Sequence, residues 1–262
     1  MPTSVGVEQR ALNTIPLADS GALALLFHLN SEPWMNQPAY DEPAPLSAFK
    51  TLDGGGERIE LPGVAGTTPL FELIRARRSL RDFADRELPL ERLAALLYRS
   101  YGFIGIRGAG REQMHHRPVP SAGALFPLEI YVITRKVGGV ADGLYHYAAW
   151  HHRLECLERG VAAYAMLADL QEQYYVAPAN AIVFLTAVFP RTMKKYGPRG
   201  YRYVLLEAGH AAQNLCLLSA EQGLGTLCMG GFRDSAINRL LRLNPATEGA
   251  VYAVAIGQAD GP

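Results

Sequence analysis

Three guanidinium groups and a hydroxyl lie within five residues of one another in the segment Arg77-Arg78-Ser79-Leu80-Arg81. Arginine binds phosphate through paired, charge-assisted hydrogen bonds, and a neighbouring serine adds a weaker donor. The segment therefore predicts a phosphate site. Arginines also stabilise the C-terminal ends of helices, so helix capping remains the alternative explanation for this cluster.

A loop of small residues begins at Pro120 and continues through Ser121, Ala122 and Gly123 to a second proline, Pro127. Proline and glycine favour irregular backbone here, and small side chains let backbone amides approach a flat ligand closely. An ordinary turn at the entrance to a strand would have the same composition. Further positions of close approach follow the longest helical pattern of the chain: Gly223, Leu224, Gly225, Gly230 and Gly231.

The segment 194–203, KKYGPRGYRY, joins a buried strand pattern to that long helical pattern through a turn rich in glycine and proline. Lys195 and Tyr196 are adjacent in it. A lysine and a tyrosine side by side can supply a proton acceptor where burial or a neighbouring cation depresses a pKa. A basic surface turn on which tyrosines pack is the alternative.

The GxGxxG fingerprint of dinucleotide-binding proteins, which follows a strand and begins a helix, does not occur in the sequence. Gly108 and Gly110 are followed by Gln113 where a third glycine would stand, and no strand pattern precedes them. The glycines at 223 and 225 end a helical pattern, and Cys228 takes the third position. No GxxxxGK[ST] segment exists either, which excludes a P-loop.

Metal-ligand motifs are also missing from the sequence. The histidine pairs 115–116 and 151–152 are adjacent residues, whose side chains point apart on a helix or a strand. There is no HExxH and no cysteine cluster. The three cysteines, an odd number, do not form a disulfide framework. We expect no metal site, and thiols that are reduced as in a cytoplasmic protein.

Helical patterns flank these segments. Thr68 and Pro69 are a typical N-cap and first-turn residue for a helix that ends at the arginine cluster. Residues 89–103 predict a second helix, with leucines at 90, 93, 96 and 97 on one face. The longest helix has an apolar stripe and ends at Gly223, and the stripe comprises positions 201, 204, 205, 208, 211, 212, 215 and 218.

Strand patterns occupy 128–135, 143–149, 153–157, 181–189 and 251–257. The second and third of these predict a hairpin, and the continuous apolar run 181–189 predicts a strand covered on both faces. Helices and strands alternate irregularly and no internal repeat occurs. The predicted class is α+β.

Prolines interrupt residues 33–45, and glycines follow at 54–56, so long regular elements are not expected there. A short apolar stretch at 22–29 predicts a helix that packs on the main domain. We therefore divide the chain into an N-terminal arm, residues 1–65, and a single domain, residues 66–262.

Charge and hydropathy exclude several classes of function. The chain has 25 basic and 25 acidic residues among 262, so no net field attracts nucleic acid or an anionic membrane. No apolar run reaches the roughly 18 residues that span a bilayer. The first residues lack the basic-then-apolar layout of a signal peptide. A cytoplasmic protein without nucleic-acid or membrane partners is expected.

In this order the segments resemble the nitroreductase superfamily. More narrowly they resemble the SagB-type or McbC-like dehydrogenases that accompany azole-forming peptide biosynthesis. The resemblance covers residues 68–257, and its motifs are RRSLRDF, PSAGALFPLEIYV, GLYHY, KYGPRGYRYVLLEAGHAAQNLCLLSAEQGLG and VYAVAIGQ.

The resemblance implies an intertwined homodimer with a central, mostly antiparallel sheet, flanking helices and a long core helix. It implies that two molecules of flavin mononucleotide (FMN) bind between the subunits. It places the RRSxR segment at the FMN phosphate and ribityl chain and the loop 120–123 against the flavin from the partner subunit. It places residues 223–225 near the N5 and O4 edge of the ring, and it matches Lys195-Tyr196 to the Lys-Tyr pair of azoline oxidases.

The implied reaction is the oxidation of a thiazoline or oxazoline in a peptide. The base at Lys195 and Tyr196 takes a proton from ring carbon and a hydride passes to flavin N5, with dioxygen as the expected final oxidant. A cyclodehydratase is a candidate partner. Three alternatives stay open: an NAD(P)H-dependent nitroreductase or quinone reductase, a dehydrogenase of a peptide- or carrier-bound amino acid, and a flavin-free binding subunit.

Overall fold

The computed structural model describes residues 22–32, 49, 56–108, 113–160 and 173–259. Most of the predicted arm, residues 1–21, 33–48 and 50–55, lies outside the described residues, and its boundary at residue 65 remains a prediction. The helices are α2 (Ala22–Asn30), α3 (Pro69–Ala76), α4 (Leu90–Tyr101), η2 (Ala122–Ala124), α6 (Gln173–Val176), α7 (Phe189–Tyr196), α8 (Arg199–Glu221) and α9 (Asp234–Leu240). The strands are β1 (Gly105–Arg107), β2 (Met114–His116), β3 (Leu128–Thr134), β4 (Gly143–Ala148), β5 (Arg153–Arg159), β6 (Ala181–Val188), β7 (Leu224–Met229) and β8 (Glu248–Gln258).

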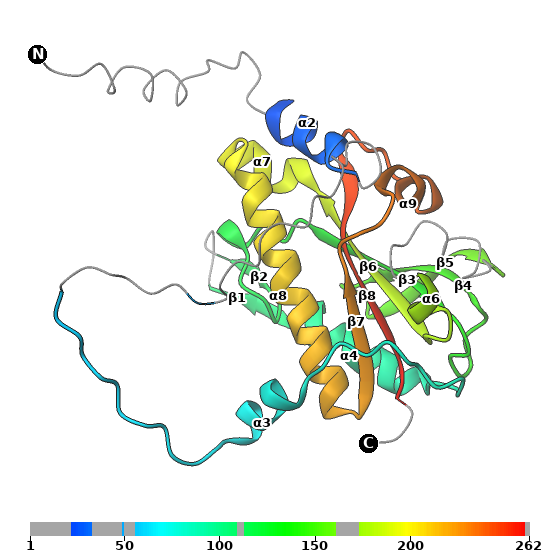
Figure 1. Cartoon of the computed structure of the whole chain (residues 1–262). Coiled ribbons are helices and arrows are strands. Elements are labelled where there is room, and N and C mark those ends of the chain that lie inside the picture. Colours follow the sequence, from blue (N-terminus) through cyan, green and yellow to red (C-terminus); the bar gives the residue numbers. More distant parts are fainter. Residues whose placement is uncertain (1–21, 33–48, 50–55, 109–112, 161–172, 260–262) are drawn as a thin grey trace, which may run out of the picture.

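A six-stranded sheet forms the centre of the molecule, with strand order β5-β4-β3-β6-β8-β7 (Figure 1). Every neighbouring pair in it is antiparallel. Strand β6 lies inside the sheet and is buried from Ala181 to Ala187, as its continuous apolar sequence predicted. The predicted α+β class and the hairpin of β4 and β5 are confirmed.

Two layers of apolar side chains cover the sheet because successive residues of a strand face opposite sides. Val183 and Leu185 of β6 pack toward α4 and α8, whereas Ile182 and Phe184 pack toward α9 and Phe232. Each fully buried side chain of this size contributes about 1.5–3 kcal/mol to folding. The sheet is therefore held rigidly beneath α8, which carries or contacts most of the candidate site.

The helices follow their predicted stripes with one exception. Leu93, Leu96 and Leu97 of α4 are buried, and α8 buries five of its eight stripe residues. Leu205 was predicted to belong to that stripe, but it is 40% exposed. Gly223 follows α8 with a φ of 66°, the left-handed conformation that a glycine after a helix adopts.

Several boundaries differ from the sequence prediction, among them strand β8, which begins at Glu248 instead of residue 251. The strand predicted to reach residue 189 ends at Val188, and a helix, α7, occupies the predicted turn before α8. Pro190 stands in the first turn of α7, where its fixed φ suits a helix. Residues 224 and 225 begin strand β7, which was not among the predicted strands. Helix α3 ends at Ala76 with Arg77 as its C-cap, so it ends at the arginine cluster as predicted.

Helix α2 packs on the main domain, as predicted. The ring of His28 lies 5.1 Å from that of Phe189, and its Nδ1 is 3.2 Å from the hydroxyl of Tyr201. The carboxylate of Glu32 accepts hydrogen bonds from the backbone N–H and the hydroxyl of Ser235. Residues 56–68, by contrast, are exposed, form no helix or strand, and extend away from the domain (Figure 1).

Candidate functional site

The arginine segment runs beside the edge strand β7. The N–H of Leu80 donates a 2.8 Å hydrogen bond to the carbonyl of Thr226. Ser79 forms an isolated parallel β-bridge with the same residue. A Cβ on Gly225 would lie 1.9 Å from Cδ2 of Leu80, so only glycine allows this approach. The structure therefore brings together two predicted segments, residues 77–81 and 223–225, within one chain.

The guanidinium groups of this segment have different surroundings. Arg77 is half-buried and lies close enough to the thiols of Cys216 and Cys228 to favour their charged forms. Arg78 is exposed and donates to the backbone carbonyls of Arg75 and Arg77, which is the helix-capping role considered as the alternative. Arg81 lies 5.9 Å from the ring centroid of Tyr175.

A second cluster forms where the loop 120–123 meets the last turn of α7. Gly123 has a φ of 64°, and a Cβ there would lie 2.8 Å from Nζ of Lys195 and 2.8 Å from the hydroxyl oxygen of Tyr196. Gly123 thus has a left-handed backbone, and a side chain there would have to displace the ends of Lys195 and Tyr196. Two segments predicted separately from the sequence, the small-residue loop and the Lys-Tyr pair, lie in contact.

The last turn of α7 orients the pair. Gly197 ends the helix with a φ of 56°, and its N–H donates to the carbonyl of Met193 at 2.8 Å. Nζ of Lys195 lies 5.3 Å from the ring centroid of Tyr196, whose ring packs edge-to-face on Tyr203 at 5.1 Å. Lys195 is exposed and Tyr196 is half-buried, so both side chains are accessible from outside the chain.

A buried hydrogen-bond network holds the loop from below. Tyr101 donates a 2.6 Å hydrogen bond to the carboxylate of Glu207, and its hydroxyl accepts from the N–H of Leu128. Ser121 also bonds to Glu207, and its hydroxyl accepts from the N–H of Phe126. Burial raises the pKa of Glu207, while the hydrogen bonds from Ser121 and Tyr101 oppose that rise.

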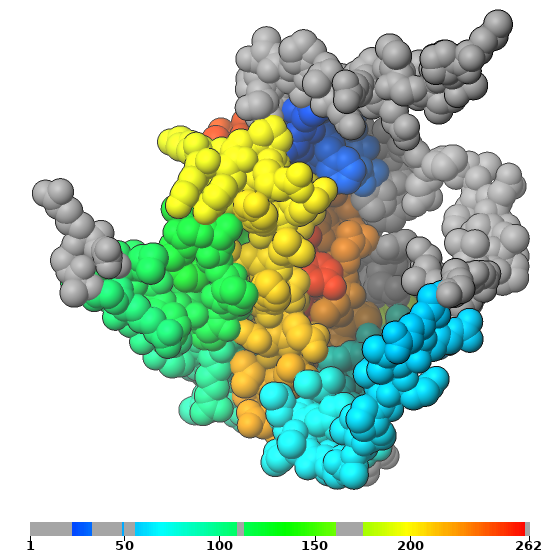
Figure 2. Space-filling view, turned by 90° about the vertical axis from the view of Figure 1, so that its left-hand side faces the viewer, coloured from blue at the N-terminus to red at the C-terminus, as the bar shows by residue number. Residues whose placement is uncertain are grey.

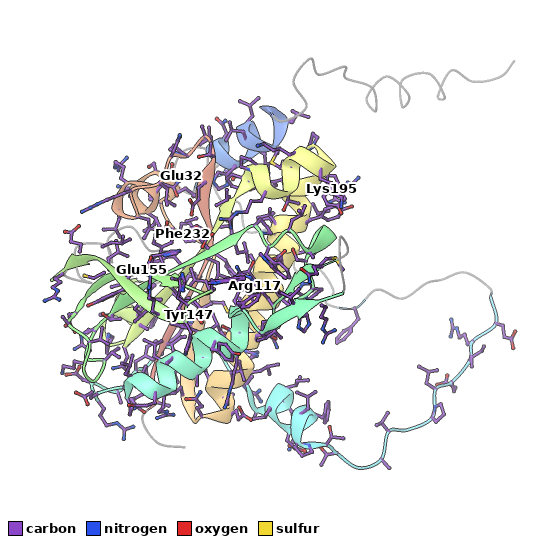
Figure 3. The ribbon with its side chains drawn as sticks, turned by 180° about the vertical axis from the view of Figure 1, so that it is seen from behind. Glu32, Arg117, Tyr147, Glu155, Lys195 and Phe232 are labelled. Atoms are coloured by element: carbon purple, nitrogen blue, oxygen red, sulfur yellow. The ribbon has the colours of Figure 1, made fainter. Side chains whose placement is uncertain are left out.

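Arg117 completes this support. Its guanidinium carbon lies 4.6 Å from the ring centroid of Tyr101 and 5.4 Å from that of Phe126. Figure 3 shows Arg117 deeper in the molecule and Lys195 at its outer edge. Glu207, Tyr101 and Arg117 were not predicted from the sequence. The charged Glu207 within a helix whose neighbours are apolar was the available signal for a buried carboxylate.

A cavity of about 450 Å³ opens beside the loop. Its lining includes Arg107, His115, Arg117, Pro120, Ser121 and Phe126. Near it, the ring of Phe103 stacks on that of Trp150 at 4.2 Å, and His115 contacts both rings. The loop therefore has open space and an aromatic surface next to it.

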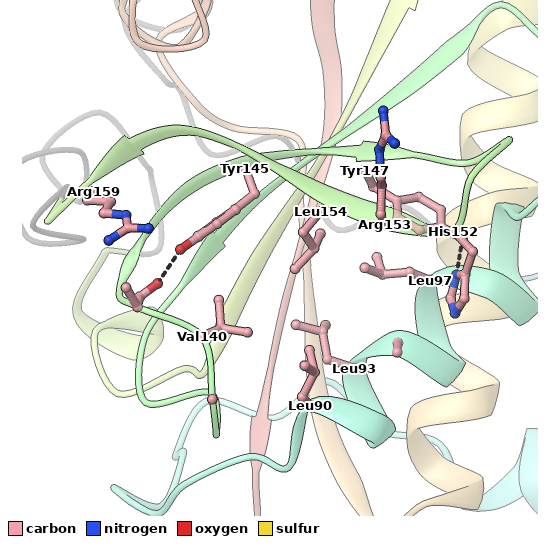
Figure 4. A pocket seen from close by; sticks show the side chains of 13 residues that line it. Leu90, Leu93, Leu97, Val140, Tyr145, Tyr147, His152, Arg153, Leu154 and Arg159 are labelled. Atoms are coloured by element: carbon pink, nitrogen blue, oxygen red, sulfur yellow. Dashed lines mark hydrogen bonds between the residues drawn. The ribbon is translucent and has the colours of Figure 1, made fainter.

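A second cavity, of about 580 Å³, lies between α4 and the β4–β5 hairpin (Figure 4). Leucines of α4 and Leu154 form its apolar wall, and the hydroxyl of Tyr147 bonds to Nδ1 of His152 at 2.8 Å. None of the predicted site residues lines it. We therefore place the candidate site at the cavity beside the loop, although it is the smaller of the two cavities.

The two clusters lie toward opposite ends of α8. The loop is bonded to Glu207, whereas the arginine segment lies near Cys216 and Thr226. Residue 216 lies nine positions after residue 207 in the helix, a rise of about 13 Å. Figure 2 shows α8 running over this face, with the loop's side of the molecule on its left and α3 at its lower end. One chain does not gather the four predicted segments into one site.

Within the described ranges, no group of three or more histidine, cysteine or acidic side chains could hold a metal ion. No helix in the described part of the chain is long and apolar enough to cross a membrane. Gly230 and Gly231 follow β7, and a Cβ on Gly230 would lie 3.9 Å from the ring of Tyr252.

The family model described as "Nitroreductase family" matches residues 74–258. The chain belongs to the nitroreductase family. It is 37% identical over 191 residues to the Methanocaldococcus jannaschii protein MJ1384, which is named as a nitroreductase, covering 72% of this chain and 92% of that protein. It is 33% identical over 236 residues to the trifolitoxin-processing protein TfxB of Rhizobium leguminosarum, covering 84% of this chain and only 57% of TfxB.

Solved structures confirm the predicted fold. The Escherichia coli microcin synthetase McbBCD, in complex with truncated pro-MccB17, contains a chain that matches with a TM-score of 0.64 and 22% identity, over 92% of this chain and 94% of that one. A nitroreductase-type protein of Desulfovibrio desulfuricans in complex with FMN matches with a TM-score of 0.52 and 17% identity, over 75% and 92% of the two chains. The protein is an oxidoreductase of a family whose members generally bind a flavin.

Proposed function

We propose that this protein is an FMN-dependent dehydrogenase that converts azoline rings in a peptide to azoles. One observation carries the proposal. The amine of Lys195 and the hydroxyl of Tyr196 meet at the backbone of Gly123, in the loop that we assign to the flavin. A flat ligand against this loop would have a nitrogen and an oxygen proton acceptor at its edge.

The relatives support a peptide substrate. TfxB is named as a trifolitoxin-processing protein, and its sequence similarity to this chain extends over 84% of the chain. The similar microcin synthetase structure holds a truncated pro-peptide. We extend this likeness to a peptide substrate for this protein and to a cyclodehydratase as its partner.

The residues present fit FMN. Arg77 offers a half-buried cation beside β7, and the close packing of Leu80 on Gly225 presents the backbone of both segments at one edge. Ser79 and Arg81 are exposed and able to reach a phosphate, and Arg78, also exposed, would have to exchange its bonds to the carbonyls of Arg75 and Arg77 for phosphate contacts. When bound, FMN supplies a two-electron acceptor for the substrate hydride.

The chain's own residues position the substrate and move one proton. The cavity beside the loop and the Phe103–Trp150 stack accept a peptide, and the network of Glu207, Tyr101 and Ser121 keeps the loop in place. Lys195 or Tyr196 accepts the proton that leaves the azoline carbon. Holding both groups against one backbone position fixes the direction of that transfer.

We propose further that the active protein is a homodimer whose site is shared between subunits. Helix α3 has no buried residues, and its apolar side chains Leu70, Phe71 and Ile74 are exposed. Leu205 and Leu206 are exposed on α8. A short helix is marginal in water without packing, so these side chains fit the surface of a second copy.

The proton-acceptor role predicts losses of activity without loss of cofactor. Lys195→Ala and Tyr196→Phe should each retain FMN and should each lower azoline oxidation by about 10²–10⁴-fold, the usual contribution of a positioned base. Turnover of a synthetic azoline peptide, followed by the loss of two hydrogen atoms in a mass spectrum, measures the effect. Lys194→Ala removes the neighbouring exposed lysine and is the matched control. Full activity in both single variants would overturn the assignment.

The phosphate role predicts a loss of FMN affinity. Arg77→Ala removes a charge-assisted hydrogen bond that contributes about 1.5–3 kcal/mol, which corresponds to roughly 10- to 150-fold in Kd. Titration of FMN into the apoprotein, followed by flavin fluorescence, measures the change. Arg75→Ala is the control, because Arg75 pairs with Glu72 on the exposed side of α3. Equal affinity in Arg77→Ala and wild type would contradict the role.

The likeness to MJ1384 favours a second candidate, reduction of a nitroaromatic or quinone by NAD(P)H. That reaction uses the flavin without a base at Lys195 and Tyr196. Oxidation of NADH or NADPH, followed by absorbance at saturating FMN, distinguishes the two functions. Activity that survives in both variants, together with no azoline turnover by the wild type, would establish the reductase instead.

A further inference from the structure

Two of the three cysteines lie in contact between α8 and β7. Sγ of Cys216, on α8, is 3.4 Å from Sγ of Cys228, on β7. Cys216 is buried, with 3% of its surface exposed, whereas Cys228 is partly exposed. The third cysteine, Cys156, is exposed on β5 and serves as an internal reference.

The surroundings of the pair make the two thiols unequal. The thiol of Cys216 donates to Cys228, and the hydroxyl of Tyr252 also bonds to Cys228, while Arg77 adds positive charge. Together these interactions lower the pKa of Cys228 to about 7, and the bond from Cys216 is the largest cause. The pKa of Cys216 is raised, because its proton is held in that bond and because the thiol is buried.

This arrangement has the parts that oxidation of a dithiol requires. The thiolate is the form of cysteine that attacks an oxidant, and reactivity follows thiolate character and access to solvent. Cys228 combines both properties. Cys216 is already in van der Waals contact with it, and a disulfide bond of about 2.05 Å requires the sulfurs to approach by little more than 1 Å.

We propose that Cys216 and Cys228 form a modification site that hydrogen peroxide oxidises to an intramolecular disulfide. The sulfur of Cys228 attacks one peroxide oxygen, the O–O bond breaks, and the departing hydroxide takes up a proton to leave as water. Cys228 is then a sulfenic acid. The sulfur of Cys216 attacks the Cys228 sulfur, the S–O bond breaks, and the second hydroxide leaves as water with the proton of Cys216. Two thiols are oxidised and one peroxide is reduced to two waters.

The bond would join α8 to β7 beside Arg77, in the segment that we assign to the FMN phosphate. The contact of the two sulfurs and the unequal exposure of the two thiols involve neither FMN nor the azoline reaction. Oxidation of the pair can therefore be tested in protein that shows no azoline turnover.

The test treats the purified full-length protein with hydrogen peroxide and then alkylates the remaining thiols in denaturant. We expect the chain to lose two hydrogen atoms reversibly, with Cys156 alkylated and the other two cysteines protected. Residues 203–233 contain no lysine or arginine before the last position, so both cysteines lie on one tryptic peptide. Cleavage after Glu221 separates them, and the two fragments remain linked only when the disulfide has formed.

Variants distinguish the two thiols. Cys216→Ser should form no disulfide and should leave a sulfenic acid at Cys228 that dimedone traps. Cys228→Ser should lose both products, and Cys156→Ser should form the disulfide as the wild type does. Urea-denatured wild type controls for folding, because the preference for the pair over Cys156 should disappear with the structure. Retention of both thiols in the native protein under peroxide that oxidises Cys156, or a disulfide that includes Cys156, would overturn the proposal.

Discussion

Gly123 shows at the scale of one residue how the site depends on a missing side chain. A methyl group there would lie 2.8 Å from both Nζ of Lys195 and the hydroxyl of Tyr196. Gly123→Ala should therefore displace the pair and lower azoline oxidation by an order of magnitude or more. It should also cost about 1 kcal/mol of stability, because alanine resists a φ of 64°.

The matched control for this change is Gly139→Ala. Gly139 has a φ of 73°, but a Cβ there would meet no atom within 4 Å. Both variants should lose similar stability in urea unfolding, and only Gly123→Ala should lose turnover of the azoline peptide. Similar turnover in the two variants would mean that Lys195 and Tyr196 do not act at this position.

Some candidate site residues could be identified from the sequence because their residue type allows few roles. Lys195 and Tyr196 stood out because they lie side by side in a segment rich in glycine and proline before the long helix, and Gly123 because it lies in a loop of small residues. That they meet was not predictable, since the contact depends on α7, where a turn was predicted. Glu207 and Arg117 were missed because burial of a charge depends on partners distant in the sequence, here Tyr101 and Ser121.

At the scale of elements, α2 illustrates how an N-terminal segment is tied to the domain through a titratable group. His28 is buried against Phe189 and Tyr201, and this burial lowers its pKa below the usual 6.5. The folded state thus binds the proton less readily than the unfolded state. The stability contributed by neutral His28 is complete above about pH 6.5 and is lost progressively as the pH falls below it.

The pH effect is measurable by urea unfolding between pH 7.5 and 5. The free energy of unfolding of the wild type should fall over this range more than that of His28→Gln, which has no proton to gain at this position. His210→Gln, a change at an exposed residue of α8, is the control and should follow the wild type. Parallel curves for wild type and His28→Gln would show that His28 does not couple α2 to pH.

Elements with strong periodicity were predicted well. The leucine face of α4 and the continuous apolar run of β6 are buried as expected, because burial selects those patterns directly. Boundaries were less predictable. The apolar run of β6 continues into Phe189 without a break in hydropathy, and Pro190 is compatible with either the end of a strand or the first turn of a helix.

At the scale of the whole molecule, the core is well buried, but several apolar side chains are exposed on the surface. The sheet is covered on both faces, whereas α3, two leucines of α8 and the extended residues 56–68 expose apolar side chains. Ile59, Leu61 and Val64 are among the exposed residues of that extended segment. A sequence pattern can identify an apolar stripe, but it does not show which of its residues the fold covers, and Leu205, predicted to lie in the stripe of α8, is 40% exposed.

The homodimer proposal predicts that oligomerisation and cofactor binding fail together. Phe71, 52% exposed on α3, lies a few residues before the arginine segment. Phe71→Asp would place a charge in the proposed interface, where an unpaired buried carboxylate costs several kcal/mol. We expect the variant to sediment as a monomer at concentrations where the wild type is a dimer, and to bind FMN at least about tenfold more weakly, since each site would lose the partner's loop.

Leu157→Asp is the control for that experiment, because Leu157 is 36% exposed on β5, away from α3 and α8 at the other edge of the sheet. It should stay dimeric and keep its FMN. Sedimentation velocity and flavin fluorescence on the same samples separate the possible outcomes. A monomeric Phe71→Asp variant with unchanged FMN affinity would mean that one chain holds the cofactor alone. The clusters at the two ends of α8 would then need a different explanation from a site shared by two copies.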